Sequence, residues 1–268
     1  MKKSLLFTTA IAVCMTAGIA AAATISQFEA VTEPTEKNLS FKVGLGVAMA
    51  PEYEGSEDYE AVAVPLASIV AKNGMSAELI GNVLRANVIP SNTWRFGPLV
   101  RYRAERNDVT NDRVDNMKKV DAATELGVYA GFDINHWNFK VDVTHDTSGV
   151  YNGTLAGISL GYTWMMARQC TLTLNGLMSI ADDRYMSTYF GVNSANRGTS
   201  GFSNYSPDGG IKDLGAALIG GHKFNDQWGL IAALRYTHLV NDADDSPLVQ
   251  DEGSEGQVLF GVLATYSF

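Results

Sequence analysis

The chain has 268 residues, of which 46% are hydrophobic, and its formal net charge is -9. This acidic balance disfavours nucleic acid as a partner, because nucleic-acid binding needs a basic face. Beyond the N-terminal segment, no stretch reaches the 18 or more apolar residues that a membrane helix needs.

The N-terminal segment is typical of a secretory signal peptide. Lys2 and Lys3 precede a largely apolar run over residues 5–20, and small residues suited to cleavage follow. We therefore predict a signal peptide over residues 1–23 and an exported protein. The exported chain then holds one cysteine, Cys170, so it has no intramolecular disulfide to staple the fold.

Residues 24–40 are polar and lack periodicity, and we predict that they form a periplasmic lead-in to a domain over 41–268. From Phe41 a unit repeats in which an alternating segment is followed by a gap. Apolar residues in the first segment fall at every second position, which indicates a strand. The later segments are expected at Ala61–Ala71, Met75–Ile80, Val83–Val88, Trp94–Arg103, Glu125–Ile134, Trp137–Val143, Ala156–Trp164, Cys170–Ile180, Lys212–Phe224, Trp228–Tyr236 and Gly256–Phe268.

The last segment shows the strand pattern most plainly. Six residues share one parity, and they are Val258, Phe260, Val262, Ala264, Tyr266 and Phe268. The chain ends on an aromatic side chain, which is typical of the strand that closes an outer-membrane barrel. A core strand of a soluble β-sandwich is the alternative interpretation.

The lengths of the gaps alternate along the chain, which favours the barrel. The longer set is Pro51–Glu60, Gly81–Asn82, Arg106–Val120, Thr147–Gly153, Asp182–Ile211 and Asn241–Glu255, with one short member. The shorter set is Lys72–Gly74, Ile89–Thr93, Asn135–His136, Arg168–Gln169 and Asn225–Gln227. Bacterial barrels have short periplasmic turns, long external loops and an even number of strands. We therefore predict an all-β, antiparallel, transmembrane β-barrel of about 12 strands, with 10 possible because the third and fourth segments are weak.

Charged residues in the strands share the parity opposite the aromatic faces. They are Arg95, Arg101, Arg103, Glu125, Asp133, Lys140, Asp142 and Arg235. A basic residue facing lipid at the midplane would cost roughly 2–4 kcal/mol, so we expect all eight to face the lumen. Both signs are present, so these side chains can pair across a narrow or largely filled barrel.

Several motifs resemble the MipA/OmpV family of outer-membrane proteins, the MltA-interacting proteins. The first covers Gly44–Tyr59, and others lie at Phe96–Tyr102, Tyr189–Val192, Tyr236–Val249 and the closing strand. The motif loops contain Pro51, Tyr53, Gly55, Asp242, Asp245, Ser246 and Pro247. The resemblance spans nearly the whole exported chain in the order of the family, and it implies a location in the bacterial outer membrane.

The resemblance also implies a function, namely a non-enzymatic scaffold that tethers a lytic transglycosylase and a bifunctional murein synthase in the periplasm. Lipid and lipopolysaccharide are the other expected partners. A second hypothesis is a narrow channel for small solutes, motivated by lumen-facing Arg95, Arg101, Arg103 and Lys140. A third is an adhesin that uses the long external loops, above all Asp182–Ile211.

Candidate sites for chemistry are weak. Acidic residues gather in the first and last external loops, and Glu52, Glu54, Asp244 and Asp245 are weak candidates for Ca²⁺ or Mg²⁺ ligands, although solvated loop carboxylates are the more ordinary interpretation. The run His145-Asp146-Thr147-Ser148 contains the residue types of a hydrolase. Adjacent strand residues point to opposite faces, however, so the run cannot itself be a catalytic triad. We predict no catalytic residues and no cofactor.

Overall fold

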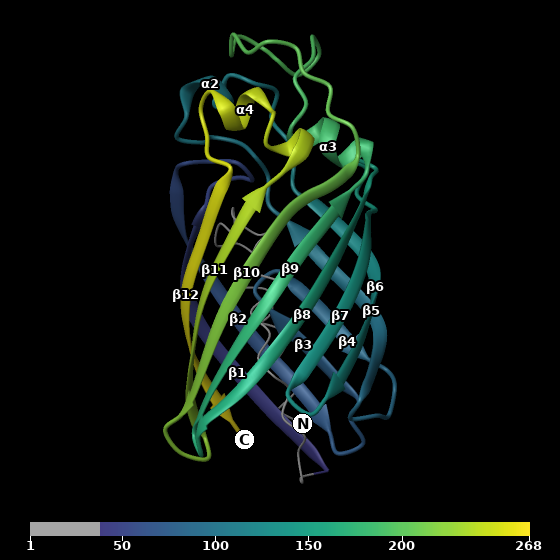
Figure 1. The fold of residues 1–268 in the computed structure, drawn as a ribbon, viewed down its shortest axis with the longest axis vertical. Helices are drawn as coiled ribbons and strands as arrows, with labels where there is room; N and C mark the ends of the chain where they lie inside the picture. Colours follow the sequence, from purple (N-terminus) through teal and green to yellow (C-terminus); the bar gives the residue numbers. More distant parts are fainter. Residues whose placement is uncertain (1–37) are drawn as a thin grey trace, which may run out of the picture.

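The computed structural model describes residues 38–268 as a closed antiparallel β-barrel (Figure 1). Twelve strands follow one another around the barrel in chain order, and β1 closes it by pairing with β12. The predicted fold class is confirmed with 12 strands rather than 10. The predicted signal peptide and the lead-in up to residue 37 lie outside the described residues.

The strands have unequal lengths, and most exceed nine residues. Their bounds are β1 Leu39–Pro51, β2 Tyr59–Ala71, β3 Ser76–Ile80, β4 Val83–Asn87, β5 Trp94–Arg103, β6 Ala123–Ile134, β7 Trp137–Asp146, β8 Thr154–Ala167, β9 Cys170–Ala181, β10 Gly210–Lys223, β11 Trp228–Leu239 and β12 Gly256–Ser267. The connections contain α2 (Asp112–Asp115), α3 (Asp183–Tyr189), the 3₁₀-helix η2 (Asn241–Ala243) and α4 (Pro247–Gln250). None of these described helices is long and apolar enough to cross a membrane.

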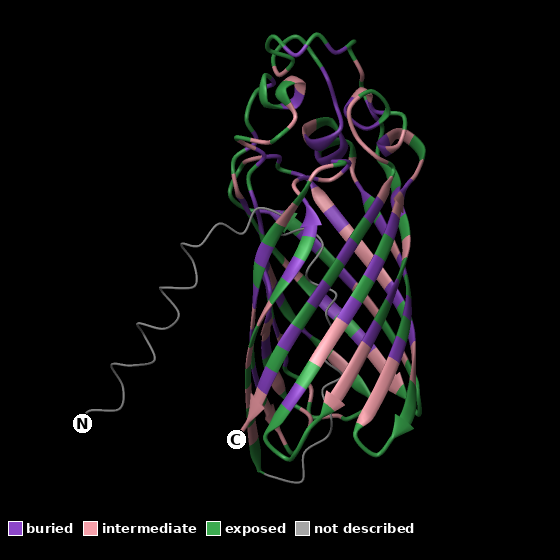
Figure 2. Ribbon diagram, turned by 90° about the vertical axis from the view of Figure 1, so that its left-hand side faces the viewer, coloured by how far each residue is buried: buried purple, intermediate pink, exposed green. Residues whose placement is uncertain are grey.

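The barrel wall alternates between exposed apolar residues and buried residues (Figure 2). In β12 the parity that contains Phe260 points outward, whereas Leu259 and Leu263 on the other parity are buried. Val47 of β1 pairs with Val262, and Val47 is 50% exposed. An outward apolar band of this kind is the surface that a membrane-spanning barrel presents to lipid.

The two ends of the barrel differ in their connections. Short turns close one end, and Asn135 in the turn between β6 and β7 adopts a positive φ of 55°, which asparagine tolerates better than most residues. The three α-helices of the described residues lie at the other end, among the long loops (Figure 1). The alternation of short and long gaps in the sequence therefore corresponds to two distinct ends.

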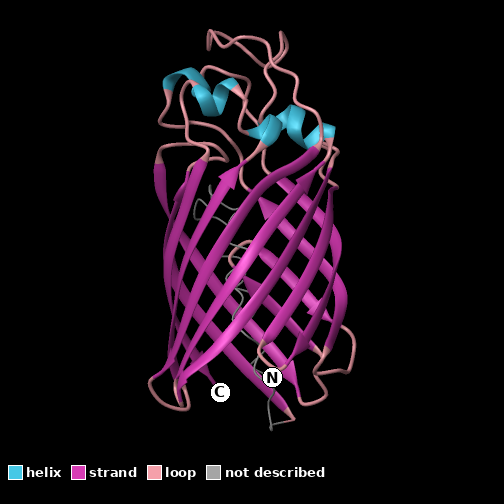
Figure 3. Cartoon of the chain, in the orientation of Figure 1, coloured by secondary structure: helices cyan, strands magenta, loops and turns pink. Residues whose placement is uncertain are grey.

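The hairpin of β3 and β4 is the exception among the strands. Each of its strands has five residues, and the turn that joins them lies at mid-height of the wall, well below the long loops (Figure 3). Both of the weak segments in the sequence are therefore strands. Their shortness explains why the Gly81–Asn82 connection is short although it faces the long-loop end.

The inner face of the barrel is not uniformly polar. Apolar residues of β1, β2, β3, β10, β11 and β12 form one buried group, here called the interior apolar patch. It consists of Ala48, Ala50, Val62, Val64, Leu66, Ile80, Ile219, Ala233, Leu259 and Leu263. Over residues 61–66 the sequence pattern of β2 is thus reversed relative to a simple lipid-facing strand, because Val62, Val64 and Leu66 point inward and the alanines point outward.

Candidate functional site

Five connections at the long-loop end pack together into one structure, here called the cap. The cap comprises residues 52–58, 104–122, 147–153, 182–209 and 240–255. One buried cluster contains Tyr185 and Phe190 of the 182–209 connection, and a second joins Tyr53 to Phe202. Figures 1 and 2 show the cap over the barrel mouth. Because the loops share buried apolar clusters, the cap is a folded part of the protein.

Arg103, the last residue of β5, joins the cap to the wall. Its Nε donates a hydrogen bond to Glu125 Oε1 of β6 at 2.8 Å, and its Nη1 lies 3.3 Å from Glu54 Oε1 of the first loop. The guanidinium also lies over the rings of Tyr185 and Tyr189, 4.8 and 5.2 Å from their centroids. Ion pairing and cation–π attraction therefore act on the same side chain.

Glu54 reaches from the first loop into this group. Its Oε2 accepts a hydrogen bond of 2.7 Å from Tyr185 Oη, and its Oε1 lies 3.4 Å from Lys212 Nζ of β10. Burial alone would raise the pKa of Glu54, but the charges of Lys212 and Arg103 outweigh burial and lower it. Glu54 is therefore an ionised counter-charge shared by α3, β5 and β10.

The position of Glu54 depends on the glycine that follows it. Gly55 has a φ of +94°, and a Cβ at that position would lie 2.7 Å from Val249 Cγ2. Only glycine adopts this backbone region without strain. The Gly55 amide donates to Gln257 Oε1 at 3.2 Å, and Gln257 Nε2 donates to the Ser56 carbonyl at 3.1 Å. These bonds fasten the first loop to β12.

A second ion-paired group lies on the wall next to Arg103. Arg101 donates to Asp142 Oδ2 at 2.9 Å and to Glu125 Oε2 at 3.2 Å, and Thr144 donates to the same oxygen at 2.7 Å. All four side chains are buried, and they come from β5, β6 and β7. Removing one partner of such a group leaves an uncompensated buried charge, so the four act as a unit.

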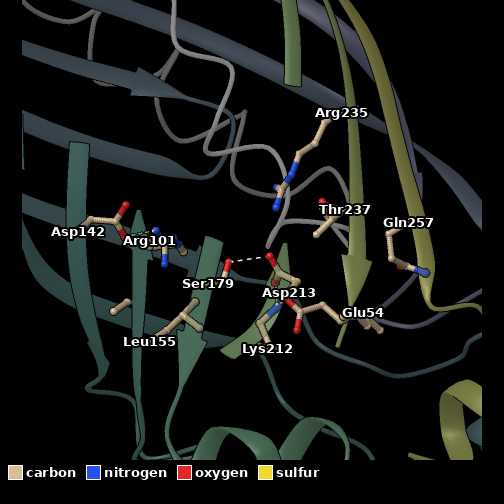
Figure 4. Close-up of a pocket in the computed structure, with 13 residues that line it drawn as sticks. Glu54, Arg101, Asp142, Leu155, Ser179, Lys212, Asp213, Arg235, Thr237 and Gln257 are labelled. Carbon is tan, nitrogen blue, oxygen red and sulfur yellow. Dashed lines mark hydrogen bonds and ion pairs between the residues drawn. The ribbon is translucent and has the colours of Figure 1, made fainter. Parts of the chain in front are cut away.

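A cavity of about 50 Å³ lies between these groups and the opposite wall (Figure 4). Lys212 pairs with Asp213 at its edge, and Asp213 accepts a hydrogen bond of 2.9 Å from Ser179. The lining of the cavity also includes Glu54, Arg101, Asp142, Leu155, Ala156, Gly157, Arg235, Thr237, Leu239 and Gln257. This volume accommodates a few water molecules and no larger solute.

The eight charged residues predicted to face the lumen divide into two groups. Five are buried near the cap, and they are Arg101, Arg103, Glu125, Asp142 and Arg235. Arg95, Asp133 and Lys140 are only partly buried and lie nearer the short turns, where Arg95 Nε is 2.6 Å from Asp133 Oδ2. Of these eight residues, the buried ones therefore lie at the cap end, whereas Glu78 and Arg85 form a separate buried ion pair in the β3–β4 hairpin.

The first motif loop is tied into the cap by its own residues. Pro51 ends β1, and the buried ring of Tyr53 packs in the cluster that contains Phe202. Burial raises the pKa of the Tyr53 phenol to about 12. Glu52 accepts a hydrogen bond of 2.8 Å from the Thr110 amide, which joins the 52–58 connection to the 104–122 connection.

The last motif loop contributes caps and turns. Ser246 is the N-cap of α4, and its Oγ donates to the Phe190 carbonyl at 2.6 Å. Pro247 is the first residue of α4, where its missing N–H is not needed. Asp242 lies in η2, and the Asp245 amide donates to the Asn241 carbonyl at 3.1 Å. These motif residues shape the cap.

The weak metal candidates do not form a common ligand set. Across residues 38–268, no group of three or more His, Cys, Asp or Glu side chains is placed to hold a metal ion. The first and last loops do meet, at a bridge between Ser56 and Gly253. Glu54 nevertheless turns inward to Lys212, whereas Asp244 accepts from Gln250 at 3.0 Å.

The His145–Ser148 run shapes the connection over residues 147–153. His145 Nδ1 lies 3.1 Å from Thr154 Oγ1 on the neighbouring strand. Asp146 accepts hydrogen bonds from the amides of Ser148, Tyr151 and Asn152, at 2.8, 2.7 and 2.8 Å. The carboxylate therefore organises its own loop.

Sequence reasoning did not find the role of α3 in the site. Tyr185 and Tyr189 are four residues apart, which places both on one face of a helix. Asp182 precedes them and accepts from the Tyr185 amide at 2.9 Å, a normal helix N-cap. This capping signal was readable in the sequence. The adjacent Lys212 and Asp213 gave no comparable signal, because their pairing with Glu54 and Ser179 depends on the closed barrel.

Comparison with known proteins identifies the family. The model of the family described as MltA-interacting protein MipA matches residues 43–268. The chain belongs to the MipA family. The outer membrane protein Omp26La of Vibrio anguillarum is 24% identical over 196 residues, which cover 73% of this chain and 71% of that protein. The resemblance inferred from the motif loops is thus confirmed, and this MipA-family protein lies in the outer membrane.

Solved outer-membrane barrels are similar at low sequence identity. They include the NanC porin, with 9% identity, a TM-score of 0.43 and coverage of 84% of this chain and 98% of that one. An outer membrane channel from Pseudomonas putida F1 has 11% identity, a TM-score of 0.45 and coverage of 90% and 99%. The translocator domain of NalP from Neisseria meningitidis has 12% identity, a TM-score of 0.46 and coverage of 87% and 90%. With TM-scores below 0.5, these barrels do not inform the function of this chain.

Proposed function

We propose that this MipA-family barrel is a non-enzymatic scaffold of the outer membrane. Its partner would be a lytic transglycosylase of the murein layer, and a murein synthase would join the same assembly. The observation that carries the proposal is the family match over residues 43–268, whose description names an interaction with MltA.

The buried charge network is consistent with a scaffold. Arg101 and Arg103 form ion pairs with Glu125, Asp142 and Glu54, so their charges are neutralised within the protein. Such groups hold the cap and the wall together, which suits a rigid membrane anchor. The small cavity beneath the cap has no room for a sugar chain of murein.

The short-turn end is the docking surface expected for a periplasmic enzyme, because short turns of bacterial barrels face the periplasm. Arg168 and Asp226 are exposed charges in two of these turns. Charged groups at the rim of an interface mainly set the association rate and the choice of partner.

A binding experiment tests this function. The refolded barrel in detergent is immobilised, and a purified lytic transglycosylase is passed over it. We expect saturable binding that weakens about tenfold, roughly 1.4 kcal/mol, when Arg168→Glu and Asp226→Lys are combined. Arg197→Glu, an exposed change in the cap, is the matched control and should leave binding unchanged. Absence of saturable binding by a correctly folded barrel would refute the scaffold.

A narrow channel is the second candidate, and the basic residues around the cavity motivate it. Arg101, Lys212 and Arg235 all line the space below the cap. Conduction would require the cap to move, because Tyr185 and Phe190 are fully buried over the mouth. Planar-bilayer conductance of the refolded barrel separates the two candidates.

A further inference from the structure

One stretch of the barrel wall has a strand partner on one side only. β2 pairs with β1 along its whole length, Tyr59–Ala71, but with β3 only over Leu66–Val70. The Gly81 amide adds one contact, to the Pro65 carbonyl at 2.8 Å. Among the described residues, 59–64 therefore have no paired strand on the side away from β1.

This gap in strand pairing beside residues 59–64 of β2, here called the interruption, arises because the β3–β4 hairpin ends at mid-height (Figure 3). On its β5 side the hairpin reaches almost to the end of the neighbouring strand. Val83 pairs with Arg101, and the Tyr102 amide donates to the Asn82 carbonyl at 2.9 Å. The uncovered edge therefore belongs to β2, between the tip of the hairpin and the cap.

The uncovered edge directs backbone polar groups into the interruption. The Pro65 carbonyl faces the hairpin, so the other odd-numbered residues of β2 direct their N–H and C=O groups the same way. Ala61 and Ala63 thus present two N–H and two C=O groups. Pro65 stands where the partner strand ends and has no N–H to leave unpaired. Open sheet edges do not normally occur in hydrocarbon, so this edge calls for a specific surrounding.

The interruption lies within the outward apolar band. Ala61 pairs with Met49 and Ala63 with Val47, and these two β1 side chains are 44% and 50% exposed. Tyr59 lies closer to the cap, where aromatic residues mark the boundary of the bilayer. The chains of membrane lipids are therefore the molecules that surround the edge from outside.

The inside of the wall beside the edge is apolar over residues 62–66, between inward-facing Glu60 nearer the cap and the buried Glu78–Arg85 ion pair of the hairpin. Val62, Val64 and Leu66 alternate with the outward alanines and belong to the interior apolar patch, with Ile80 of β3 and Leu259 of β12. The charged groups of the site lie mainly on other strands. An apolar surface therefore continues from the lipid side to the barrel interior along β2.

We propose that the interruption is a lateral passage, through which an alkyl chain of a lipid in the surrounding bilayer enters the barrel and lies on the interior apolar patch. The small side chains of Ala61 and Ala63 leave the edge unobstructed from outside. A strand of a second copy is a poorer occupant, because Pro65 interrupts the row of donors that strand pairing uses. This proposal is independent of the scaffold function.

Contact quenching by brominated lipids tests the passage. A single cysteine at Val64→Cys, in a Cys170→Ser background, carries a bimane label, and the processed protein is reconstituted into phosphatidylcholine vesicles with brominated acyl chains. Ser159→Cys is the matched control. Ser159 is buried and faces inward, as Val64 does, and each residue lies five positions from the cap end of its strand. The two strands, β8 and β2, are diametrically opposite in the barrel. We expect at least twofold quenching at position 64 relative to unbrominated vesicles, and none at position 159.

A second variant closes the interruption without touching the label. Lengthening each strand of the hairpin by four residues between Ile80 and Val83, eight in all, with the glycine–asparagine turn retained, should supply partners for Ala61 and Ala63 and abolish quenching at position 64. Equal quenching at positions 64 and 159 would overturn the proposal. So would quenching at 64 by aqueous iodide alone, which indicates a water-filled opening. Disulfide cross-linking of Ala61→Cys between copies, with no quenching by lipid, would assign the edge to a dimer instead.

Discussion

The hydroxyl of Tyr185 donates a hydrogen bond of 2.7 Å to Glu54 Oε2, which joins residues 131 positions apart. Through this bond α3 is fixed to the first loop, and Arg103 lies against both partners. Contacts between residues so far apart in the sequence form only when the barrel is closed. The cap can therefore form only on a natively folded wall.

Glu54→Gln should loosen the cap. The amide keeps an acceptor for Tyr185 but removes the charge that Arg103 and Lys212 share. Loss of one partner from a buried ion pair costs roughly 3–5 kcal/mol. We expect trypsin to cleave faster at Arg184, in α3, in the detergent-refolded variant than in the wild type.

Glu57→Gln is the control for that experiment, since Glu57 is exposed in the same loop. Its cleavage rate should match that of the wild type. Equal protection of α3 in wild type and Glu54→Gln would show that the charge of Glu54 does not hold the cap.

Acid should loosen the cap through the same carboxylate. The pKa of Glu54 is lowered below its ordinary 4.5 in the folded protein, so its contribution is complete above the unfolded value and is lost as the pH falls through the folded one. Protection of α3 amides from hydrogen exchange, after correction for intrinsic rates, should therefore be constant between about pH 5 and 8 and should decline below 4.5. In Glu54→Gln the decline should be smaller. An equal decline in both proteins would assign the acid sensitivity to other carboxylates.

Two glycines of the cap allow a matched comparison. Gly55 and Gly201 have φ values of +94° and +77°. A Cβ at Gly55 would meet Val249, whereas a Cβ at Gly201 would have no atom beyond its two chain neighbours within 4 Å. Left-handed backbone costs other residues about 1–2 kcal/mol. Gly55→Ala should therefore destabilise the cap by more than Gly201→Ala, measured by hydrogen exchange in α3. A larger effect at Gly201 would contradict the close packing at Gly55.

Much of the wall was predictable because strand alternation is local. The outward parity of β12, which includes Val258 to Ala264, followed from apolar spacing alone. The two distinct ends of the barrel followed from the gap lengths. The position of β2 was harder to interpret. Its inward valines and outward alanines reverse the expected pattern, because this strand lines the interior apolar patch.

The cap was not predictable in the same way. The sequence indicated long loops, but no local pattern pairs Glu54 with Lys212 or brings Tyr189 over Arg103. Gly55 was noted only as a residue of a motif loop, and the structure shows that it has a positive φ of 94°. Charged residues in strands could be placed on the inner face, whereas their partners follow from the strand register around the closed barrel.

Planar-bilayer conductance should separate the scaffold from the channel. We expect the refolded wild type to be silent, because α3 covers the mouth and the cavity below it holds only a few water molecules. Replacing residues 184–208 by a short glycine–serine linker removes Tyr185 and Tyr189 from the mouth. If the cap is the barrier, this variant conducts, and adding Arg101→Glu with Arg103→Glu shifts its selectivity toward cations. Discrete conductance steps in the wild type would instead show that the cap opens unaided and would favour the channel.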